Sequence, residues 1–191
     1  IDQDIRTMHE NEIEGYVESV IHSELSESYW TSVLPQAMNV SNSNSPYWHV
    51  YRATQVKMND KGFLSRDITV RELIEYKSDV HHVFPRDLLK KQGLSRGQYN
   101  QIANYVIAQS EINIAIGNKS PDNYFQSLIE QVNGGGRKYG NIADEQELIE
   151  NLQQNCIPVG IETMNVDDYQ DFLAQRRILM AEKIHSYFTL L

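Results

Sequence analysis

The strongest constraint on the fold is an apolar stripe close to the C-terminus. Large apolar residues recur there at spacings of about three and four, as on one face of a helix. The stripe comprises Tyr169, Phe172, Leu173, Leu179, Met180, Ile184, Tyr187, Phe188 and Leu191. Asp167 and Asp168 precede it, where the dipole of a helix favours acidic side chains. The pattern therefore predicts a long C-terminal helix with its stripe in the core.

The rest of the chain predicts shorter helices and two short strands. Residues 8–25 have helical apolar spacing and an acidic outer face. Helices are also expected to begin at Pro46, at Thr69 with its capping-box partner Glu72, and at Ser120-Pro121. Further helices are expected over residues 28–35 (kinked or ended by Pro35), 86–92, 95–104 and 110–117, and strands over 79–85 and 105–108. The predicted fold class is α+β, mainly α.

Charge is distributed unevenly along the chain. The 17 basic and 26 acidic side chains give a net charge of −9, which argues against a general nucleic-acid binder. Residues 141–171 carry eight acids and no Lys or Arg. Residues 77–97 carry five basic and two acidic side chains, a net charge of +3. This cationic stretch also contains a pair of adjacent histidines.

Several classes of protein are excluded by composition. The 191 residues suffice for a hydrophobic core. Cys156 is the single cysteine, so neither an internal disulfide nor a four-cysteine zinc site can form. No apolar run approaches the roughly 18 residues of a membrane helix, and no signal-peptide pattern begins the chain. The expected compartment is the cytoplasm. Because the chain starts with Ile1, we expect it to be a piece of a longer protein.

The candidate chemistry centres on the adjacent histidines. His81 and His82 lie on the first predicted strand, so their side chains are expected to point to opposite faces. Such a pair can divide two tasks, because one imidazole can bind a metal while the other takes a proton. Asn104 opens the second predicted strand, and Asn113 follows nine residues later. Alone, Asn104 also suits a turn and Asn113 the polar side of a short helix.

The order of these residues resembles a known nuclease motif. His81-His82-Val83-Phe84-Pro85 followed by Asn104 and Asn113 is similar to the ββα-metal, or HNH, nuclease finger. The HNH domains of RNA-guided Cas nucleases share this order and spacing, with Asp in place of His81. Four further segments also resemble those of a known protein family: Gly62 to Ser65, Tyr99 to Tyr105, Asn113 to Tyr124 and Arg176 to Ile184. Over residues 45–191 the chain resembles the C-terminal region of GmrSD-like proteins, a bacterial group linked to modification-dependent (type IV) restriction.

The resemblance implies a division of roles at the finger. His82 would be the general base that takes a proton from water. Asn104 would hold the loop between strand and helix so that His82 points correctly. His81 and Asn113 would bind a divalent metal, and Asp79 would either add an oxygen ligand or orient His81.

The same resemblance leaves two points open. Arg86, Lys90 and Lys91 either contact the phosphates that flank the cleaved bond or form an ordinary solvated face. Mg²⁺ is the expected ion, but the nitrogen of His81 leaves Mn²⁺, Ni²⁺ or Zn²⁺ open. Many HNH proteins brace the finger with paired Cys-x-x-Cys zinc sites, which this chain lacks, so neighbouring helices are expected to do so.

The predicted organisation has three regions. Residues 1–60 are expected to form a helical segment that links to an N-terminal domain, which the resemblance implies is ParB-like. Residues 61–130 would contain the nuclease finger that the resemblance implies, and residues 131–191 would form a C-terminal helical layer. Arg176 and Arg177 in that layer are expected to pair with acids. The implied function is metal-dependent hydrolysis of DNA in restriction and antiviral defence, with modified phage DNA as a candidate partner and no membrane contact. Two alternatives remain. The substrate is RNA, or the chain is a non-catalytic regulatory or partner-binding domain that keeps the fold.

Overall fold

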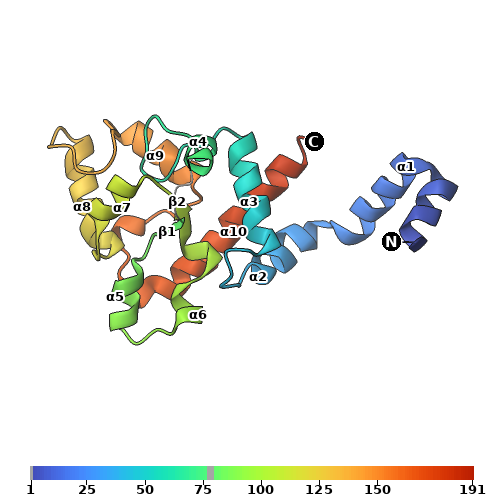
Figure 1. Ribbon diagram of the computed structural model, residues 1–191, viewed down its shortest axis with the longest axis horizontal. Coiled ribbons are helices and arrows are strands. Elements are labelled where there is room, and N and C mark those ends of the chain that lie inside the picture. Colours follow the sequence, from blue (N-terminus) through green and yellow to red (C-terminus); the bar gives the residue numbers. More distant parts are fainter. Residues whose placement is uncertain (1, 77–79) are drawn as a thin grey trace.

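The computed structural model describes residues 2–76 and 80–191 and is mainly helical, with one small two-stranded sheet (Figure 1). This confirms the predicted α+β, mainly α class. In the first half lie α1 (Asp2–Glu24), a π-helical turn (Tyr29–Val33), α2 (Leu34–Ala37), α3 (Pro46–Lys57), α4 (Val70–Glu75), β1 (Val80–His82), α5 (Arg86–Lys91) and α6 (Arg96–Tyr99). The second half contains β2 (Tyr105–Ile107), α7 (Ser110–Ile116), α8 (Pro121–Val132), α9 (Glu145–Gln154) and α10 (Tyr169–Phe188), and 3₁₀ turns span Ile102–Asn104, Ile161–Thr163 and Val166–Asp168.

Local capping signals fix the starts of several helices as predicted. Pro46 and Pro121 occupy the first turns of α3 and α8. At α4 the Thr69 hydroxyl accepts the Glu72 N–H at 3.2 Å, and the Glu72 carboxylate accepts the Thr69 N–H at 2.7 Å. This reciprocal capping box satisfies two of the N–H groups that a helix start leaves unpaired.

The second helix ends before Met38, as expected. The π-helical turn Tyr29–Val33 runs without a break into α2, which contains Pro35 and ends at Ala37. Two other expectations about helices need correction. The helix expected over residues 95–104 stops at Tyr99, the end of α6, and Asn100 and Gln101 separate α6 from the 3₁₀ turn. Helix α9 was not predicted, although the Asp144 carboxylate caps it by accepting the Glu147 N–H at 2.9 Å.

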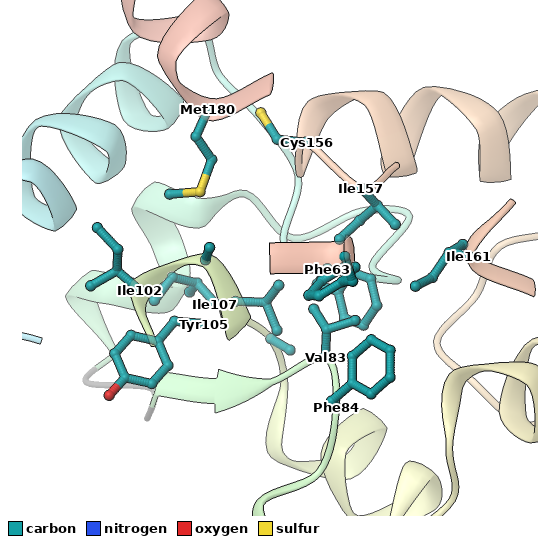
Figure 2. Packing of buried hydrophobic residues seen from close by; sticks show 14 of the residues in the cluster. Phe63, Val83, Phe84, Ile102, Tyr105, Ile107, Cys156, Ile157, Ile161 and Met180 are labelled. Carbon is teal, nitrogen blue, oxygen red and sulfur yellow. The ribbon is translucent and has the colours of Figure 1, made fainter. Parts of the chain in front are cut away.

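Helix α10 carries the predicted stripe up to Phe188 and runs through the middle of the molecule (Figure 1). The expectation for Leu191 is wrong, because this residue lies beyond the end of the helix and is exposed. Its residues Phe172, Leu173, Met180 and Ile184 are buried, and the helix packs on α2 and α3. Figure 2 shows part of the cluster, in which Val83 and Phe84 lie beside Phe63 and Ile157. Buried side chains from all three predicted regions belong to this one cluster, as Trp48, Phe84 and Phe172 illustrate.

The expectation that Arg176 pairs with an acid is wrong. Its guanidinium is fully buried and donates to the backbone carbonyls of Ala103, at 2.9 Å, and Asn155, at 3.2 Å. Ala103 lies in a short 3₁₀ turn, and Asn155 caps the end of α9. Because a helix leaves its last carbonyl oxygens without an N–H partner from the same helix, these two oxygens can accept from the guanidinium. Arg177 forms no ion pair with any residue that the structure describes.

The N-terminal helix α1 projects away from the rest of the molecule (Figure 1). A break in helical geometry at Glu12, with φ of 61°, divides it in two. Its apolar residues Ile13, Val17 and Ile21 are exposed. Among the described residues, no helix combines the length and the hydrophobicity that crossing a membrane requires.

Candidate functional site

The two strands form an antiparallel pair that positions the histidines. Val80, His81 and His82 pair with Ile107, Val106 and Tyr105, respectively. The His82 ring meets the Tyr105 ring edge-on, with centroids 5.1 Å apart and an interplanar angle of 89°. Because Tyr105 is buried beneath it, this contact fixes one side of the imidazole.

A hollow of about 420 Å³ opens beside β1 and collects several predicted site residues. It is lined by Val80, His81, His82, Pro85, Arg86, Asp87, Asn113, Gly117 and Asn118. Both histidines line it although they alternate along the strand. The strand ends at His82, and the chain then turns toward α5, so the hollow reaches around the strand end. The structure therefore brings His81, His82, Asn113 and Arg86 to one cavity.

The segment that follows His82 is anchored in the core. The Phe84 ring packs on Phe172 and Tyr169 of α10, with centroids 4.9 and 5.3 Å away. The hydroxyl of Tyr124, from α8, donates to the Val83 carbonyl at 3.2 Å. Helices α8 and α10 thus hold this end of β1 in place.

Asn104 ties the same segment to the second strand. Its side-chain oxygen accepts the Phe84 N–H at 2.8 Å, and its amide donates to the carbonyls of Phe84 at 3.0 Å and Tyr99 at 3.2 Å. The side chain is fully buried and does not line the hollow. Asn104 is therefore a positioning residue: it fixes the backbone that follows His82 and touches nothing in the cavity.

Asn100 contacts His82 directly, and sequence reasoning missed it. Its side-chain oxygen lies 3.0 Å from His82 Nε2. An amide oxygen can only accept, so this contact is a hydrogen bond in the tautomer that carries its proton on Nε2 and keeps a lone pair on Nδ1. Asn100 follows α6 as its C-terminal cap residue. It lies in the segment Tyr99 to Tyr105 noted above for its resemblance, but the resemblance gave this residue no role. The contact with His82 arises only when α6 and β1 are folded together.

The surroundings favour the neutral form of His82. Burial lowers the pKa of this imidazole below its ordinary value of 6.5, and the charges of Arg86 and His81 lower it further. The hydrogen bond to Asn100 acts in the opposite direction but does not outweigh burial. A neutral ring at neutral pH is the state that can accept a proton.

The donors at the hollow are few and chemically mixed. His81 offers an imidazole nitrogen, and Asn113, in the middle of α7, offers an amide oxygen. Residues 2–76 and 80–191 contain no group of three His, Cys, Asp or Glu side chains arranged to hold a metal. A divalent ion held by His81 and Asn113 alone would have to keep most of its water and complete its shell with substrate oxygens. Asp79, the third predicted ligand, lies outside the described residues.

The predicted phosphate-contact residues separate into two groups. Arg86 lines the hollow, and its exposed guanidinium lies 3.4 Å from the Asp87 carboxylate. Lys90 and Lys91 are exposed in the last turn of α5 and do not line the hollow. Of these three residues, Arg86 is therefore the one that borders the histidines' hollow.

Comparisons with known proteins give one partial match. No protein-family model matches the chain, and no solved structure does. An uncharacterized protein of Methanocaldococcus jannaschii is 28% identical over 123 residues, a stretch that covers 57% of this chain. The same stretch covers 20% of the archaeal protein, so the chain matches a minor part of its relative's length.

Proposed function

We propose that this chain hydrolyses phosphodiester bonds of DNA with a divalent metal at the hollow beside β1. The observation that carries the proposal is the shared lining: His81, His82 and Asn113 border one cavity together with Arg86. The ββα order of β1, β2 and α7, with a His pair and two Asn in sequence, supports an HNH-type finger.

In this mechanism the chain's own residues supply a base, ligands and a phosphate contact. His82 takes a proton from water at Nδ1, since Asn100 engages Nε2 and burial keeps the ring neutral. His81 and Asn113 would hold the metal, and Arg86 would contact a phosphate oxygen of the bound strand. When bound, the ion supplies Lewis-acid stabilisation of the charge that develops on the phosphate and leaving oxygen. Asn104 holds the loop that carries this arrangement.

The biological setting proposed from the sequence is restriction of foreign DNA. The resemblance to GmrSD-like proteins favours an antiviral nuclease in the cytoplasm that acts on modified phage DNA, joined to a ParB-like domain. The net charge of −9 predicts weak DNA affinity for this chain alone, because binding of phosphates depends on cationic side chains. Target recognition is therefore assigned mainly to the rest of the full-length protein.

A non-catalytic binding domain is the competing function. The sparse donor set at the hollow and the acidic surface favour it, because neither is typical of an efficient DNA nuclease. In that case His82 and Asn100 would serve only to stabilise the hairpin.

Nicking of supercoiled plasmid DNA separates the two functions. The protein is assayed with Mg²⁺, Mn²⁺, Ni²⁺ or Zn²⁺, and a matched RNA serves as a second substrate. We expect nicking with at least one ion and a loss of about 100-fold or more in the His82→Ala variant. His49→Ala, at an exposed histidine of α3, is the control and should retain full activity. Full activity in folded His82→Ala, or no cleavage by the unaltered protein with any of the four ions, would favour the binding domain.

A further inference from the structure

A second surface, separate from the histidine hollow, lies around the turn at Val159. One depression, of about 460 Å³, is bordered by α8, α9 and residues 157–162. Another, of about 580 Å³, lies between the same turn and α10. The two depressions share Gln153, Ile157, Pro158 and Val159, and neither shares a residue with the histidine hollow. Val159 thus forms a ridge with a hollow on each side.

This surface is unusually apolar for an exposed region. Val159 is 98% exposed, and Ile129, Ile149 and Ile178 are 40%, 42% and 45% exposed. These side chains come from the turn, α8, α9 and α10, so they gather from four segments of the chain. Contiguous exposed apolar side chains with a polar rim are typical of protein interaction sites, whereas single exposed residues are not.

The rim of the surface is negatively charged. Glu145 and Glu162 border the first depression, and Glu182 borders the second. None of these three forms an ion pair with any residue that the structure describes. Lys183 also borders the second depression, but its ammonium lies 2.8 Å from the Asp60 carboxylate, which neutralises it. The surface therefore has apolar side chains at its centre and three acidic side chains without ion-pair partners among the described residues at its rim.

We propose that this surface binds an amphipathic helix of a partner protein, with Lys or Arg flanking its large apolar residues. Apolar side chains one helical turn apart would enter the depressions on either side of Val159, as in other helix-in-groove complexes. The partner's cationic side chains would meet Glu145, Glu162 and Glu182 at the rim. The acidic rim disfavours nucleic acid and also a second copy of this acidic chain. The inference is independent of the proposed nuclease function.

Binding of defined peptides to the whole chain tests the proposal. The probe is a synthetic amphipathic helix built from leucine and lysine, and its leucine–glutamate counterpart is the charge control. We expect saturable binding of the leucine–lysine peptide in fluorescence anisotropy. Val159→Asp should weaken it about tenfold or more, because the ridge lies at the centre of the contact. Val33→Asp changes a valine of the π-helical turn that is 53% exposed and lies outside both depressions, and it should leave binding unchanged.

A second set of variants tests the charges. The test variant replaces Glu145, Glu162 and Glu182 with Gln. It should bind the leucine–lysine peptide more weakly than the unaltered protein at about 0.1 M salt. At about 1 M salt the two affinities should differ little, because the charges are strongly screened. Circular dichroism verifies that each variant is folded, and Ile149→Asp repeats the test on the α9 side. The proposal is overturned if the leucine–glutamate peptide binds equally well, if Val159→Asp binds like the unaltered protein, or if no saturable binding occurs. Self-association that Val159→Asp abolishes would assign the surface to a second copy instead.

Discussion

Two asparagines do different work beside His82. Asn104 is buried and makes three side-chain hydrogen bonds to the backbone of Phe84 and Tyr99, so it holds the protein chain. Asn100 makes one side-chain hydrogen bond, to the imidazole itself, so it holds the ring. Removing either side chain should therefore give distinguishable defects.

Asn104→Ala should lower the free energy of unfolding by about 3 kcal/mol, because it leaves the buried N–H and carbonyl of Phe84 without partners. The Tyr99 carbonyl keeps a second donor, the Tyr169 hydroxyl at 3.3 Å. Asn100→Ala should change that free energy by less than about 1 kcal/mol but slow plasmid nicking about tenfold. Urea denaturation and the nicking assay measure the two effects. Asn39→Ala, at an exposed asparagine, is the control for stability. If Asn100→Ala nicks at the unaltered rate, the ring is positioned by Tyr105 alone.

At the scale of elements, the starts of α3, α4 and α8 were predictable because each depends on two or three neighbouring residues. Helix α9 carries the same kind of signal, because Asp144 and Glu147 cap its start. It was missed because its acidic residues were interpreted only as part of the charge distribution over residues 141–171. Its burial depends on distant contacts: the Asn151 side chain bonds to Gly62, Leu64 and Ser65.

The candidate site was predictable to a similar extent. The resemblance in order and spacing predicted three site residues, His81, His82 and Asn113, and all three border one hollow. Asn100 could not be found in this way, because its role depends on where α6 ends relative to β1. Residues that act through packing between elements leave no local pattern.

Gly140 joins the loop after α8 to the core in a way that only glycine permits. Its φ is +53°, and a Cβ there would collide with the carbonyl oxygen of Leu64. Gly140→Ala should therefore lower the free energy of unfolding by about 3 kcal/mol. Gly136→Ala, in the same loop but with open space around it, should be nearly neutral. Urea denaturation of both variants checks this, and equal stabilities would mean that the loop shifts freely away from Leu64.

At the scale of the whole molecule, a buried ion pair connects the middle of the chain to α10. Lys183 lies 2.8 Å from Asp60, which follows α3, and both side chains are largely buried. Burial raises the pKa of Asp60 above its ordinary value, although Lys183 acts to lower it. The carboxylate therefore depends on the lysine for compensation.

Lys183→Met should lower the free energy of unfolding by about 3 kcal/mol near neutral pH, because it leaves a buried carboxylate alone. Without the lysine the pKa of Asp60 rises further, so in the variant the native state binds a proton that the unfolded state does not. The loss should therefore shrink as the pH falls through that raised pKa. Adding Asp60→Asn should restore part of the stability. Urea denaturation across a pH series measures these changes, and a loss that is independent of pH would contradict this explanation.

The order in which these parts are made has a consequence for the cell. The strand with His82 leaves the ribosome well before α10, yet its neighbour Phe84 rests on Tyr169 and Phe172 of that helix. Domains generally fold as units during synthesis. We therefore expect the segment after His82 to be held in place only after α10 has been made, so the proposed hydrolysis would begin only after translation has passed α10.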